Sequence, residues 1–106
     1  MDLNNLMKQA QEMQKKMSVI QADLAKKVIT GSAGGGMVEV TVNGQGDILG
    51  IKIEDALINV DEKEMLQDLI TAATNDGVRR AKELSKQEMG QLTGGMGLPD
   101  MANFLS

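Results

Sequence analysis

The hydrophobic residues of the first quarter of the chain repeat with the spacing of an α-helix. From residue 3 to residue 24 they follow one another at alternating steps of three and four, which is the heptad pattern of a helix with a narrow apolar seam. No glycine or proline interrupts Asp2–Val28, and good helix formers dominate it. The pattern predicts a long helix whose seam consists of Leu3, Leu6, Ala10, Met13, Met17, Ile20 and Leu24.

This helix is too long for the globule that the rest of the chain can build. A helix of this length spans about 39 Å, whereas a compact domain of this size has a radius of gyration of about 13 Å. We therefore expect the helix to project and its seam to need cover from elsewhere, and a second copy of the chain is the simplest source. The seam thus favours a homodimer; the alternative is a surface helix packed on its own domain.

After the helix the period changes to that of β-strands. Val28–Thr30 is β-branched and predicts a short strand, which the glycine-rich segment Gly31–Gly36 interrupts. Met37–Asn43 alternates strictly, Asn43–Gly46 supplies turn residues, and Asp47–Glu54 resumes the alternation. These segments predict a β-hairpin. Val38, Val40 and Val42 share one face of the first strand, and Leu49, Ile51 and Ile53 share one face of the second.

A second long helix is predicted to follow the hairpin. Asp61 is the expected N-cap, and Glu64 three residues later completes a capping box. Val60 and Met65 have the spacing of a hydrophobic staple around that cap. An apolar face follows, made of Met65, Leu66, Leu69, Ile70, Ala73, Ala81 and Leu84.

Glycines punctuate the second half of the chain. Gly77 lies inside the second helix, where it indicates a bend or a close contact, and Gly90 is the expected end of the helix. We interpret residues 91–106 as a flexible tail with glycine and methionine, and residues 1–90 as one domain. The order is long helix, short strand, hairpin and long helix. It predicts an α+β fold with a small antiparallel sheet.

Composition excludes most enzyme classes. The chain has 106 residues and contains no Cys, His, Trp or Tyr. Disulfides, the usual zinc and haem ligands, a Cys nucleophile and a Ser-His triad are therefore absent, and we expect no catalysis, cofactor or small-molecule substrate. No apolar run is long enough for a membrane span, and the first residues do not resemble a signal peptide. The expected compartment is the cytoplasm.

Three motifs have some resemblance to ligand sites. Gly31–Gly36 lacks the Lys and the following helix of a phosphate loop, so a turn explains it. Asn43–Glu54 resembles a calcium loop, but its sixth position is Ile48 where glycine is needed, and a hairpin explains the same residues. The acidic stretch from Asp55 to Asp68 could hold magnesium or simply form a solvated surface.

Charge is unevenly distributed along a chain with a net charge of −4. Residues 1–30 carry five lysines against three acids, and residues 77–90 carry four basic residues against two acids. Residues 31–62 carry six acids against one lysine. The basic helical segments could follow a phosphate backbone or could merely be solvated. The candidate DNA-binding residues are Lys8, Lys15, Lys16, Lys26, Lys27, Arg79, Arg80, Lys82 and Lys86.

Four segments, in order along the chain, resemble one known family. Asn5–Met17, Gly36–Gly44, Glu64–Ile70 leading into Asn75-Asp76, and Gly95–Pro99 are similar to the YbaB/EbfC family of bacterial nucleoid-associated DNA-binding proteins. The resemblance implies an α–β–α chain that forms a tweezer-shaped homodimer, binds duplex DNA and alters its conformation. It further implies a place in the nucleoid, and roles in nucleoid organisation and gene expression without catalysis.

The resemblance also implies where DNA binds. In the family the helices that flank the sheet are implicated, which on this sequence are the segments that carry the nine basic residues. Glu39 and the turn Gln45–Asp47 are more acidic or neutral than in many members, which weakens the case for the hairpin as a DNA surface. The alternative function is a dimeric protein–protein adaptor that uses the Met-rich seam and the tail.

Overall fold

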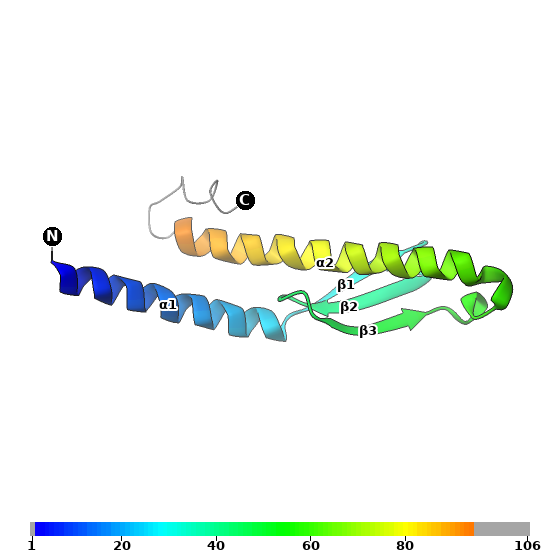
Figure 1. The fold of residues 1–106 in the computed structure, drawn as a ribbon, viewed down its shortest axis with the longest axis horizontal. Helices are drawn as coiled ribbons and strands as arrows, with labels where there is room; N and C mark the ends of the chain where they lie inside the picture. Colours follow the sequence, from blue (N-terminus) through cyan, green and yellow to red (C-terminus); the bar gives the residue numbers. More distant parts are fainter. Residues whose placement is uncertain (1, 95–106) are drawn as a thin grey trace.

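The computed structural model describes residues 2–94, and it has the predicted α+β fold (Figure 1). The chain is elongated, with extents of 69 × 23 × 15 Å and a Cα radius of gyration of 19.1 Å. This confirms that the first helix projects from the rest of the fold. In chain order the elements are α1 (Leu3–Lys26), β1 (Val28–Ala33), β2 (Val38–Asn43), β3 (Ile48–Ile53), two 3-10 turns η1 (Asp55–Leu57) and η2 (Val60–Glu62), and α2 (Lys63–Gly94).

The sheet has three antiparallel strands in the order β1-β2-β3. The predicted hairpin is present as β2 and β3, with a bulge between Thr41 and Val42. The expectation that the first strand stops at Gly31 is wrong, because β1 continues to Ala33 and Gly31 pairs with Val40. The turn is formed by Gly34–Met37, and its three glycines all have positive φ.

Helix α2 lies across β1 and β2, and the core is formed there. Val38, Val40 and Val42 of β2 are fully buried, as their alternation predicted. Gly77 marks a close contact: a Cβ on Gly31 of β1 would overlap the backbone of Gly77 in α2. Two glycines thus allow the strand and the helix to approach closely, which brings α2 onto the sheet.

The start of α2 differs from the predicted capping box. The helix is entered through η2, and the capping side chain is Asn59, whose Oδ1 accepts from the Asp61 N–H at 3.0 Å. Asp61 therefore lies inside the turn, and α2 itself begins at Lys63. The predicted staple is also absent, since Val60 is 88% exposed and Met65 is exposed as well.

The end of α2 also lies beyond its predicted position. The helix continues through Gly90 to Gly94. A glycine inside a helix costs only about 1 kcal/mol relative to alanine, and the good helix formers around Gly90 outweigh that cost. Most of the proposed tail, residues 95–106, lies outside the described residues, as does the Gly95–Pro99 motif.

Candidate nucleic-acid interface

Helix α1 forms an arm that is fixed only at its base. Leu24 is its one buried residue, and the Leu24 carbonyl accepts a hydrogen bond from the Gly44 N–H at 2.7 Å. The Gln45 side chain donates to the Gln21 carbonyl at 3.0 Å. The middle of the arm lies alongside the C-terminal half of α2 with opposite chain direction, and its N-terminal turns reach beyond the end of α2 (Figure 1). The apolar seam is largely uncovered in the single chain, with Leu3 70% exposed.

Most of the arm's lysines are available to a ligand. Lys8, Lys15, Lys16 and Lys26 are exposed, and none forms an ion pair with another residue of the described chain. Lys8 and Lys26 are eighteen positions apart, about 27 Å along the helix. The arm therefore presents cationic groups over a length close to one turn of duplex DNA, about 34 Å.

Lys27 is committed to a contact within the fold. Its Nζ lies 2.7 Å from the Glu88 carboxylate of α2. This ion pair joins residues 61 positions apart and connects the base of the arm to the second helix. Lys27 is thus a structural residue of the arm's base, although the sequence placed it among the DNA-binding candidates.

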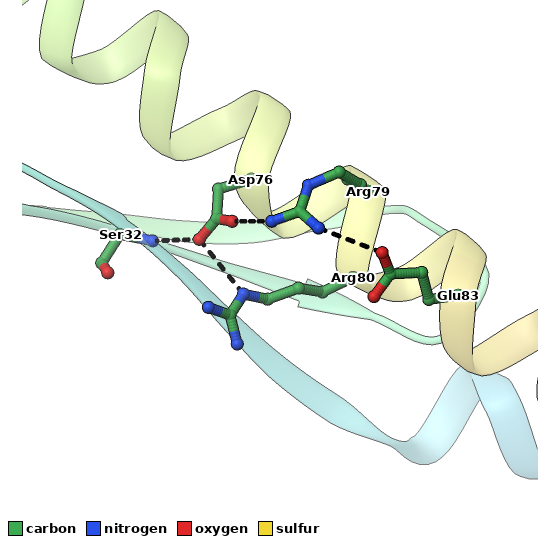
Figure 2. A network of polar contacts seen from close by, with 5 residues as sticks. All are labelled: Ser32, Asp76, Arg79, Arg80 and Glu83. Atoms are coloured by element: carbon green, nitrogen blue, oxygen red, sulfur yellow. Dashed lines mark hydrogen bonds and ion pairs between the residues drawn. The ribbon is translucent and has the colours of Figure 1, made fainter.

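Arg79 and Arg80 of α2 are also paired (Figure 2). The Asp76 carboxylate accepts from Arg79 Nη2 at 2.7 Å and from Arg80 Nε at 3.2 Å, and Arg79 Nη1 donates to Glu83 at 3.0 Å. Asp76 also accepts from the backbone N–H of Ser32 in β1 at 3.0 Å. That backbone bond, together with the arginines, holds the pKa of the Asp76 carboxyl below its ordinary value. The Asp76 carboxylate, with Glu83 beside it, raises the pKa of the Arg79 guanidinium.

Lys82 and Lys86 continue along α2 without such partners. Both are exposed, and neither forms an ion pair with any residue from 2 to 94. Lys82 lines an open hollow of about 590 Å³ together with Ser85 of α2, Gln21 of α1 and the β2–β3 turn. The arm, the hairpin turn and α2 therefore meet at this hollow, beside Lys82.

Ion pairing thus divides the nine candidates into two groups. Six lysines are unpaired within the described chain, and Lys27, Arg79 and Arg80 are paired. The pairs within α2 have the i,i+3 and i,i+4 spacing that the sequence already shows, so Asp76 and Glu83 could have been found from it. The Lys27–Glu88 pair could not, because it depends on the packing of α1 against α2.

A second surface carries apolar rather than charged groups. Ile48, Leu49 and Ile51 of β3 are 51%, 55% and 48% exposed, since α2 covers the other two strands. β3 pairs with β2 alone, so its outer edge has no partner strand in the described chain. A free, apolar strand edge of this kind is a template for pairing with another chain.

The structure gives no support to a metal site or a membrane span. Among residues 2–94, no three His, Cys, Asp or Glu side chains are grouped so that they could hold a metal ion. The acidic stretch after β3 is therefore not assembled into a magnesium site within that range. Neither described helix contains an apolar segment that could cross a bilayer.

Comparison with known proteins gives matches over nearly the whole chain. The family model of the YbaB/EbfC DNA-binding family matches residues 1–96. A nucleoid-associated protein of Desulfotalea psychrophila is 80% identical over 106 residues, which is all of both chains. One from Clostridium novyi is 50% identical over 101 residues, covering 95% of this chain and 89% of that protein.

The fold has a counterpart among solved structures. An uncharacterized protein from Helicobacter pylori superimposes with a TM-score of 0.79 and is 30% identical in sequence. The match covers 87% of this chain and 97% of that one. The arrangement of two long helices around a small sheet is therefore shared with that protein.

Proposed function

This chain belongs to the YbaB/EbfC DNA-binding family, and from that premise we propose that it binds duplex DNA as a homodimer in the bacterial nucleoid and alters the path of the duplex. Its role would be to organise the nucleoid and to influence gene expression, without catalysis. The observation that carries this proposal is the set of exposed lysines on α1 and α2 that form no ion pair with any residue from 2 to 94.

The unpaired lysines suit a phosphate backbone better than they suit base reading. An unpaired ammonium group can neutralise a phosphate and release a counterion from the DNA, which drives binding without regard to sequence. A lysine that already contacts a carboxylate gains less from the same exchange. We therefore assign the DNA contacts to Lys8, Lys15, Lys16 and Lys26 of the arm and to Lys82 and Lys86 of α2.

The apolar edge of β3 supports a homodimer. The Glu54 N–H bonds to the Met37 carbonyl at 2.9 Å, so the alternation of an antiparallel ladder directs the N–H and C=O of Ile51 outward. A two-fold axis at Ile51 would pair β3 with its copy and join the two sheets into one. In that register Lys52 lies opposite Gly50 of the other copy, so no like charges face one another.

A homodimer of this kind would carry two arms. Each arm is pinned at Gln21, Leu24 and Lys27, so its direction relative to the sheet is set by the fold. A joined sheet would then fix the separation of the two arms, and a duplex that contacts both would follow the path they impose. This is the physical basis that we propose for a change in DNA conformation.

Two pairs of variants of equal charge test where DNA binds. One pair is Lys15→Gln, which removes an arm lysine, and Lys63→Gln, which removes the same charge from the start of α2; the other is Lys16→Gln with the same control. We expect each arm variant to bind a duplex more weakly than the control variant, as measured by fluorescence anisotropy at low salt. Equal affinity of the arm variants and the control would move the interface away from the arm.

A further inference from the structure

The cluster around Asp76 resembles a phosphate site with an internal carboxylate in place of the ligand. Asp76 Oδ1 accepts from Arg79, and Oδ2 accepts from both Arg80 and the Ser32 backbone. An arginine fork fits a carboxylate and a phosphate with the same geometry. Arg79 has both of its terminal nitrogens engaged, by Asp76 and Glu83. Three N–H donors of the two arginines that could bind a DNA phosphate are therefore already in use.

The fold keeps Asp76 in this place. Its side chain is 18% exposed, whereas those of Arg79 and Arg80 are 60% and 54% exposed. The bond from the Ser32 N–H lies next to the close contact of Gly31 with Gly77, where β1 and α2 cannot slide past one another without a clash. The carboxylate thus links α2 to β1, and the arginines are its more exposed partners (Figure 2).

The cluster lies at one end of a row of cations. Arg79, Lys82 and Lys86 are spaced by three and four residues, so they share one face of α2. The two lysines of the row have no ion pair in the described part of the chain, whereas Arg79 has two. Asp76 and Glu83 balance the charges of Arg79 and Arg80, so the cluster has no net charge to attract DNA from beyond a Debye length of about 8–10 Å.

From this arrangement we propose that Arg79 and Arg80 form a latent binding site for a nucleic-acid phosphate, which Asp76 keeps closed. Asp76 thereby limits how tightly the protein holds DNA, and the contacts remain with the six unpaired lysines. This inference rests on the proposed DNA binding. It adds a site that the wild-type protein does not use and names the residue that suppresses it.

The variant Asp76→Asn tests the proposal. Asparagine keeps the size of the side chain and can still accept the Ser32 N–H, but it removes the negative charge from the two arginines. The matched control is Asp68→Asn, an exposed position of α2 that contacts no arginine in the described chain and gives the same change in net charge. Both are titrated with a duplex at 50 and 200 mM salt.

We expect Asp76→Asn to bind DNA more tightly than Asp68→Asn, with a steeper salt dependence. Each freed phosphate contact adds about −0.9 to the slope of log affinity against log salt, so the advantage grows about threefold per contact between 200 and 50 mM salt. Adding Arg79→Gln and Arg80→Gln to Asp76→Asn must remove the gain. Equal affinity and slope of the two aspartate variants, or weaker binding by Asp76→Asn, would overturn the proposal.

Two outcomes are kept separate by the design. A wild-type protein that fails to bind the duplex at 50 mM salt contradicts the proposed function, whereas wild-type binding without a gain in Asp76→Asn contradicts only the latent site. Should Asp76→Asn fail to fold, Glu83→Gln frees one nitrogen of Arg79 at an exposed position of α2. It must then steepen the salt dependence relative to Asp68→Asn, and an unchanged slope would overturn the proposal.

Discussion

The backbone of Gly31 in β1 lies directly against the backbone of Gly77 in α2. A Cβ on Gly31 would meet the Gly77 nitrogen and the Ala73 carbonyl oxygen, and neither can move without shifting the helix. The contact brings α2 onto β1 next to the Ser32–Asp76 hydrogen bond. The bond from the Ser32 N–H to the Asp76 carboxylate therefore depends on how closely two glycines allow the strand and the helix to approach.

Gly31→Ala is expected to destabilise the fold strongly. Overpacking of a close contact typically costs about 1–3 kcal/mol, and here the obstructing atoms are backbone. The control, Gly90→Ala, should raise stability by up to about 1 kcal/mol, because a Cβ there meets nothing within 4 Å and alanine favours a helix. Far-UV circular dichroism during thermal unfolding measures both. A Gly31→Ala protein as stable as wild type would contradict the described contact.

A single cysteine at the centre of β3 tests the proposed dimer. The chain has no cysteine, so Ile51→Cys can form a disulfide only with another copy. Directly opposed residues in a hydrogen-bonded antiparallel pair have Cα atoms about 5.5 Å apart, which suits a disulfide. We expect a covalent dimer on non-reducing gels after mild oxidation. Val19→Cys, exposed on the arm, is the control and should cross-link much less.

The mass of the native protein in solution is a second test of the proposed dimer. Ile51→Lys would place like charges opposite one another on the two-fold axis, so we expect it to sediment as an 11.4 kDa monomer while wild type sediments as a dimer. If Ile51→Lys remains a dimer and Ile51→Cys does not cross-link, the dimer interface does not lie at β3. A monomeric wild-type protein would contradict the homodimer itself.

The lowered pKa of Asp76 predicts a pH dependence of stability. A carboxyl whose pKa is depressed by folding contributes stability above its ordinary pKa, about 3.9, and loses it as the pH falls through the folded value. Wild type should therefore be more resistant to urea than Asp76→Asn at pH 7, and the difference should shrink below about pH 4. A difference in urea midpoint that does not change with pH would contradict this role of the carboxylate.

Features set by local pattern could be predicted from the sequence. The alternation of Val38, Val40 and Val42 marked the buried strand, and the unbroken seam from Leu3 to Leu24 marked the projecting helix. Both follow from periodicity, which depends only on neighbouring residues. These patterns alone did not distinguish a DNA-binding surface from a solvated basic surface. The DNA-binding function came from the family resemblance.

Features set by competition or by tertiary contact could not be predicted in the same way. Asn59 and Asp61 both have side chains that commonly cap helices. Because a 3-10 turn precedes α2, Asn59 caps that turn and Asp61 lies inside it. Gly90 has the chemistry of a helix end, but its neighbours continue the helix. The sequence gives no sign that Lys27 is paired, because its partner Glu88 is brought beside it only by the packing of α2. The candidate site was thus predicted as a region, and packing decides which of its cations are free.

The salt dependence of duplex binding by the wild-type protein shows whether the unpaired lysines contact the DNA phosphates. If unpaired lysines of α1 and α2 neutralise phosphates, log affinity must fall linearly with log salt, with a slope of about −0.9 for each phosphate contacted. With several lysines in contact, we expect a steep slope and a large loss of affinity between 50 and 200 mM salt. A flat response across that range, or no binding at low salt, would contradict it.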